Sequence, residues 1–104
     1  MLRHVFLADV RPGIAAQDVD QLLAAWRAFP AAIAEIRSLT AGRNLNRDDR
    51  RYAVVLVADF EDGGAWQIFM QHPAHVAVRE GISAKVLAPE TRVMVQYVIE
   101  TRTN

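Results

Sequence analysis

The clearest strand in the sequence is Tyr52-Ala53-Val54-Val55-Leu56-Val57-Ala58-Asp59-Phe60-Glu61 (residues 52–61), in which both faces are apolar. A strand buried on one side should alternate apolar with polar residues, whereas a nearly continuous apolar run indicates cover on both sides. The helices predicted elsewhere in the chain are too few to cover both faces. The sequence therefore predicts a sheet with helices on one face and a partner on the other.

The flanking sequence predicts three more strands and three main helices. The strands are expected at residues 2–10, 36–43 and 91–100, and the helices at 15–29, 65–71 and 74–86, with one extra turn over 31–34. The turn signals Arg11-Pro12-Gly13 and Asp62-Gly63-Gly64 separate strand from helix. The order β-α-β-β-α-β is the ferredoxin-like plan of the α+β class, a four-stranded antiparallel sheet with its helices on one face.

Composition narrows the possible partners and location of the chain. Its 104 residues fit a single domain, residues 1–104, and 52% of them are hydrophobic while the formal net charge is zero. With a net charge of zero, the chain has no overall positive charge that would attract nucleic acid. No apolar run approaches the roughly 20 residues that a membrane span needs. With no signal peptide at the start, the cytoplasm is the expected location. Zero cysteines exclude disulfides and thiolate chemistry.

Two of the three histidines lie in Phe69-Met70-Gln71-His72-Pro73-Ala74-His75-Val76, where two predicted helices meet. Proline suits the first turn of a helix and keeps the preceding residue out of the α region, so Pro73 should begin a helix and leave His72 outside it. The two rings should therefore not stack as a helical metal pair, and no metal site is predicted. His72 is instead expected nearer the surface, in a structural role such as capping.

His75 is the candidate general base. It falls in the first turn of the predicted helix, where the positive end of the helix dipole and partial burial should both lower its pKa and keep the ring neutral. The alternative is that His75 caps a turn or fills the core without chemistry.

His4 lies in the first strand on the same face as Leu2, Phe6 and Ala8. A histidine in such an apolar row is usually a core residue with its hydrogen bonds satisfied. The alternative is that it faces the same cleft as His75. The arginines of the polar connection 44–51 are expected in a solvated loop rather than an anion site, because neighbouring aspartates neutralise half of them.

These residues together resemble one family. Arg3-His4-Val5-Phe6-Leu7, Gly42-Arg43-Asn44, the strand from Tyr52 to Phe60, and above all Gln71-His72-Pro73-Ala74-His75 are similar to the stress-responsive dimeric A/B barrel (Dabb) family. The resemblance covers nearly the whole chain. It implies a ferredoxin-like protomer that pairs sheet to sheet with a second copy, as a homodimeric α/β barrel.

One characterised member, the plant olivetolic acid cyclase, performs an aldol condensation on a polyketide without metal or cofactor. Its first-strand histidine corresponds to His4 here, and its catalytic histidine corresponds to His75. The tyrosine that assists that histidine corresponds to Phe69, whose phenyl ring can line a pocket but cannot hydrogen-bond a carbonyl oxygen or a base.

Two functional interpretations stay open, and neither needs a cofactor. In the first, a small cyclase- or lyase-type enzyme acts on a carbonyl compound between sheet and helices, with His75 as base and His4 as its partner or as an oxyanion donor. In the second, the same cleft binds a small apolar ligand, or nothing, without catalysis. The residues expected around a ligand are Phe6, Trp66, Phe69 and His72. An open cleft that both histidines face would favour the enzyme.

Overall fold

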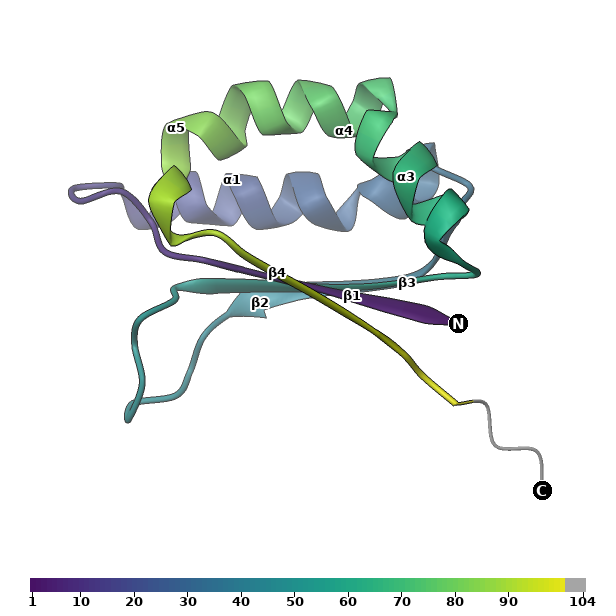
Figure 1. The fold of residues 1–104 in the computed structure, drawn as a ribbon. Helices are drawn as coiled ribbons and strands as arrows, with labels where there is room; N and C mark the ends of the chain where they lie inside the picture. The colour runs from purple at the N-terminus through teal and green to yellow at the C-terminus, as the bar shows by residue number, and fades with distance from the viewer. Residues whose placement is uncertain (101–104) are drawn as a thin grey trace.

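The protein is described here by a computed structural model over residues 1–100 (Figure 1). Its strands are β1 (Leu2–Ala8), β2 (Ile36–Arg43), β3 (Val54–Phe60) and β4 (Val93–Val98). Its α-helices are α1 (Ala16–Arg27), α2 (Phe29–Ala32), α3 (Gly63–Gln71), α4 (Pro73–Val78) and α5 (Ala84–Val86), with a π-helical turn at Arg79–Ser83 and a 3-10 turn at Pro89–Thr91. No helix in this part of the chain is long and apolar enough to cross a membrane.

The four strands form one antiparallel sheet in the order β2-β3-β1-β4. All the helices lie on one face of it, as Figure 1 shows, so the predicted ferredoxin-like arrangement is confirmed. Between the helices and the sheet lies a continuous core, whose largest fully buried side chains are Phe60, Leu22, Ile33, Val54 and Val86. His4, Phe6 and Ala8 of β1 point to this side, since His4 and Ala8 are buried and Phe6 packs against the core.

The helices differ from the prediction in two places. The helix expected over residues 15–29 ends at Arg27, because the proline ring at position 30 would clash with the helical carbonyl four residues earlier. Pro30 instead sits in the first turn of the separate helix α2. The helix expected over residues 74–86 begins at Pro73 and is interrupted by the π turn, where Gly81 takes a non-helical conformation with ψ of −105°.

The strands were predicted at the right places, and three of the four are shorter than expected. The first ends at Ala8 rather than residue 10, because the Asp9 amide donates to the Thr91 hydroxyl instead of to a neighbouring strand. The strand expected over residues 91–100 starts only after the 3-10 turn, at Val93. β3 begins at Val54 rather than at residue 52, because the Asn44 side chain holds the Tyr52 carbonyl in the connecting loop.

The sheet face away from the helices has an apolar centre. The registers place Val5, Leu7, Val55 and Val57 side by side there, with Val95 of β4 as their 51% exposed neighbour. At one end of this face, Arg3 donates two hydrogen bonds to Asp59, at 2.8 and 2.9 Å. We call this surface the outer sheet face.

Candidate functional site

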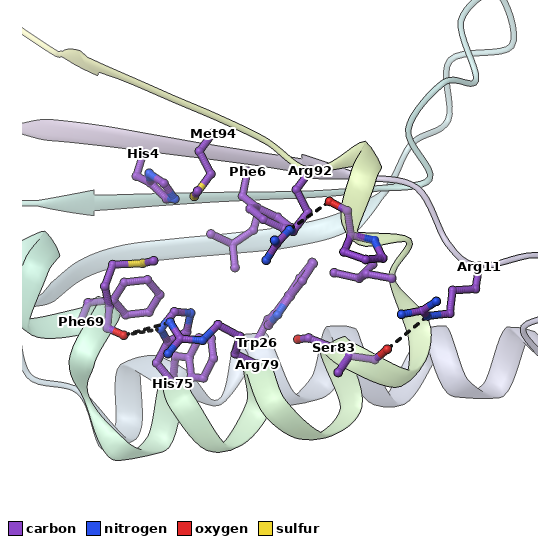
Figure 2. A pocket seen from close by; sticks show the side chains of 16 residues that line it. His4, Phe6, Arg11, Trp26, Phe69, His75, Arg79, Ser83, Arg92 and Met94 are labelled. Carbon is purple, nitrogen blue, oxygen red and sulfur yellow. Dashed lines mark hydrogen bonds between the residues drawn. The ribbon is translucent and has the colours of Figure 1, made fainter.

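A cavity of about 220 Å³ lies between the sheet and the helices (Figure 2). Its walls come from β1, α1, α2, β3, α3, the segment from α4 to α5, the 3-10 turn and β4. Its polar lining residues are His4, His75, Ser83, Arg11, Arg79 and Arg92. Its other lining residues are Phe6, Trp26, Phe29, Leu56, Phe69, Met70, Ala84, Leu87, Pro89 and Met94. The space between sheet and helices is thus not filled by side chains, and both candidate histidines line it.

A backbone hydrogen bond fixes the protonation of the His75 ring. Its Nδ1 lies 3.1 Å from the carbonyl oxygen of Met70, near the end of α3. Because a carbonyl oxygen only accepts, Nδ1 carries the hydrogen and donates it, so the neutral ring has its lone pair on Nε2. The contact exists because Pro73 begins α4 directly after the turn at His72, which brings the first turn of α4 back toward the end of α3. His75 thus has a free basic nitrogen.

Two phenyl rings enclose His75. Phe69 stacks on it with centroids 4.3 Å apart and planes 26° apart, and Phe29 meets it edge-on at 5.5 Å. Burial among these rings lowers the pKa of His75, and the positive charge of Arg79 lowers it further, although the Met70 carbonyl acts in the opposite direction. His75 is consequently neutral at pH 7, in the form that can accept a proton.

His4 is 2% exposed, and its hydrogen lies on the other ring nitrogen from that of His75. Its Nδ1 lies 3.0 Å from the side-chain nitrogen of Gln96 on the adjacent strand β4. An amide nitrogen only donates, so His4 Nδ1 accepts and its hydrogen is on Nε2. Burial lowers the pKa of His4, with a further contribution from His75, and the neutral ring can offer Nε2–H as a donor.

His72 and Trp66 lie outside the lining of the cavity. The His72 ring accepts a hydrogen bond from the Ala74 amide at 3.1 Å, so His72 caps α4, which is the structural role expected for it. Trp66 packs beside His4 with ring centroids 5.6 Å apart, and its buried indole N–H has no partner within residues 1–100. Of the aromatic residues expected around a ligand, only Phe6 and Phe69 line the cavity.

Comparison with known proteins places the chain in a family. Residues 2–99 match the family described as the stress responsive A/B barrel domain. The chain belongs to this family. No curated protein matches the sequence. The predicted family is thereby confirmed.

Solved structures resemble this Dabb domain over nearly its whole length. A dimeric ferredoxin-like protein of unknown function from Thermobifida fusca is 30% identical, with a TM-score of 0.82, covering 94% of this chain and 90% of its own. The hydroxynitrile lyase from Passiflora edulis is 16% identical, with a TM-score of 0.80, covering 99% and 96%. A cofactor-independent oxygenase from Streptomyces nogalater is 18% identical, with a TM-score of 0.71, covering 97% and 94%. At such low identity, the last two show the fold alone.

Several residues that line or support the Dabb cavity were not predicted. Phe29 and Trp26 were not among the residues expected around a ligand, yet both line the cavity. Gln96 orients His4 from a strand whose register could not be predicted from sequence. Arg79 follows His75 at a spacing of four, which on a helix places both side chains on one face, and this was a usable signal.

The arrangement offers one acceptor and one donor in an apolar cavity. His75 Nε2 can accept a proton, and His4 Nε2–H can donate a hydrogen bond to an oxygen. Within residues 1–100, no three histidine, aspartate or glutamate side chains gather as a potential set of metal ligands. The two histidines of the site can therefore take part in proton transfer and hydrogen bonding.

Proposed function

We propose that this Dabb domain binds a small carbonyl compound in the cavity and that His75 removes a proton from it. The observation that carries the proposal is the pair of contacts made by the two rings, His75 Nδ1 with the Met70 carbonyl oxygen and His4 Nδ1 with the Gln96 amide nitrogen. These partners direct the lone pair of His75 and the N–H of His4 to Nε2 of each ring. A collapsed interior would have favoured a non-catalytic protein, whereas the cavity is open.

The step we propose is abstraction of a proton from a carbon next to a carbonyl group. Nε2 of His75 takes the proton, and the electron pair of the broken C–H bond moves into an enolate. The negative charge that develops on the carbonyl oxygen is stabilised by the Nε2–H of His4. The imidazolium of His75 later returns the proton to the product, so that no cofactor takes part.

Phe69 limits which reaction of this kind is feasible. Its ring stacks on His75 and has no hydroxyl, so the carbonyl oxygen receives no phenolic hydrogen bond from this position. The proposal is therefore a proton transfer rather than the cyclisation that depends on a tyrosine. The names of two structural neighbours, a hydroxynitrile lyase and a cofactor-independent oxygenase, support enzyme activity on this fold.

We also propose that the protein is a homodimer joined through the outer sheet face. The side chains of Val5, Leu7, Val55 and Val57, with the more exposed Val95 beside them, form one contiguous apolar patch, and such patches on protein surfaces mark interaction sites. Relatives of this fold are described as dimeric, including the one that is 30% identical. The cavity lies on the opposite side of the sheet, so each protomer has its own.

The test of the catalytic proposal is hydrogen–deuterium exchange at the α-carbon of a simple ketone, such as phenylacetone, followed by NMR in D₂O. The wild-type protein should accelerate the exchange, and His75→Gln should reduce the acceleration by about 10²–10⁴-fold. His72→Asn is the matched control, because it changes a histidine outside the cavity to another capping residue.

Two results would count against the proposal at different levels. If phenylacetone shifts the resonances of cavity residues but its exchange rate does not depend on His75, the protein is a binding module without this chemistry. If neither phenylacetone nor related ketones perturb the cavity resonances, the proposed carbonyl ligand is wrong as well.

A further inference from the structure

Three arginines line the cavity, and the proton transfer described above uses none of them. Arg11 follows β1, Arg79 begins the π turn, and Arg92 precedes β4. Figure 2 shows Arg79 beside His75 and Arg11 at the opposite end of the cavity. The lining includes no aspartate or glutamate. Although the whole chain has a formal net charge of zero, the lining of this cavity carries three positive side chains, all solvent-exposed, and no negative one.

None of the three guanidinium groups forms an ion pair within residues 1–100. Each donates one hydrogen bond to a backbone carbonyl: Arg11 to Ala84 at 3.2 Å, Arg79 to Met70 at 3.3 Å and Arg92 to Pro89 at 3.2 Å. A guanidinium has five N–H donors, so most of them remain available. Four other arginines are in ion pairs, for example Arg3 with Asp59 and Arg43 with Asp20, whereas Arg27, Arg47 and Arg50 form none within residues 1–100.

We propose that the natural ligand of the cavity is a small organic carboxylate whose body is apolar, held by Arg79 and Arg92. The planar fork of a guanidinium matches a carboxylate with two parallel hydrogen bonds. The apolar body would lie between Phe6, Trp26 and Phe69. This inference rests on the proposed function, because the carboxylate would be a second group on the carbonyl compound that His75 acts on.

The size of the cavity favours a small molecule. At about 220 Å³ it is below the roughly 300–1,000 Å³ of typical drug-sized pockets. Most of its lining side chains are apolar, which suits a compound with one charged end. A highly charged polyphosphate would leave much of its polar surface against hydrocarbon.

The helix places the anion beside the base. His75, Arg79 and Ser83 follow one another at intervals of four residues, and all three line the cavity. A carboxylate bound to Arg79 would therefore place the adjacent carbon atoms near His75. It would also neutralise the positive charge of Arg79, one of the causes that lower the pKa of His75. Binding of an anion should consequently raise that pKa, while a neutral ligand should not.

The experiment compares carboxylates with their primary amides, which have similar shape and no charge. Phenylacetate, cinnamate and octanoate, each with its amide, are titrated into the full chain by NMR and calorimetry, and inorganic phosphate is titrated separately. We expect the best carboxylate to bind at least about tenfold tighter than its amide, with the preference reduced by salt. Arg79→Gln and Arg92→Gln should each reduce the preference, whereas Arg47→Gln, in the exposed β2–β3 loop, should not.

Each outcome is decisive for a different claim. Equal binding of acid and amide would overturn the carboxylate inference while leaving the cavity a binding site. Tight binding of phosphate alone would overturn it in favour of an inorganic anion. If no probe binds, the proposed small-molecule function fails together with the inference. A carboxylate that binds and raises the His75 pKa in the wild type, but not in Arg79→Gln, would support it.

Discussion

Replacing Phe69 with leucine should weaken the fold and raise the pKa of His75 in the same protein. Phe69 is 2% exposed and its ring contacts Phe29, Phe60 and His75 at centroid distances of 5.5, 5.2 and 4.3 Å. Phe→Ala changes in cores cost about 3–5 kcal/mol, and leucine keeps part of the buried volume, so we expect a loss of about 1–3 kcal/mol. For a domain of this size, each kcal/mol lowers Tm by about 4–8 °C.

The pKa of His75 should rise in this variant because burial is the main cause that lowers it. A smaller side chain at position 69 lets water reach the imidazole, so the value should move toward about 6.5, that of a free histidine. NMR titration of the imidazole measures the pKa, and thermal unfolding at fixed protein concentration measures the stability.

Ile33→Val is the matched control. Ile33 is fully buried but does not line the cavity, so its change should cost about 0.5–1.5 kcal/mol without moving the His75 pKa. The reasoning would be refuted if Phe69→Leu lowered Tm as expected but left the His75 titration unchanged.

Three further predictions follow from other parts of the fold. Val95→Glu should give a monomer in sedimentation velocity, whereas Ile68→Glu, at a similarly exposed position on the helical side, should leave the dimer intact. Gly13 has φ of +79°, so Gly13→Ala should lower the free energy of unfolding by about 1 kcal/mol or more in urea titrations. His4 and His75 have lower pKa values in the folded protein than in the unfolded chain. Their contribution to the free energy of unfolding should therefore be fully present above about pH 6.5 and be lost as the pH falls through the lowered values. Urea titrations over a pH series would measure this loss, and they would show none if both rings were exposed.

The sequence predicted the fold because its strongest signals are local or periodic. The strand 36–43 was placed with its observed bounds, and the doubly apolar strand around Val54–Phe60 indicated a sheet with two covered faces. Pro73 fixed the start of α4, since its ring suits a first helical turn. The interruption at Gly81 was missed, because one glycine in a helical pattern does not show whether the helix continues through it.

The candidate site was only partly predictable, because its parts meet through strand register and side-chain packing. His4 was named from the period of the first strand and His75 from its place in the helix that Pro73 begins, and the family resemblance pointed to both; both line the cavity. Trp66 was expected there as well, but its side chain packs beside His4 instead. The partnership of His4 with Gln96 joins residues 92 positions apart, and no local pattern indicates such a pair.

The central position of β1 has a consequence for how the chain is made. β1 comes before all the other strands of the sheet in sequence, yet it pairs with β3 on one side and with β4 on the other. It must therefore remain unpaired until its neighbours have been translated, and such non-local pairing is slow. A nascent chain that stops before β4 would expose one whole edge of β1, the kind of edge that templates aggregation. It would also lack the Gln96 amide that orients His4, so the His4 ring takes its observed hydrogen bond only once β4 has paired.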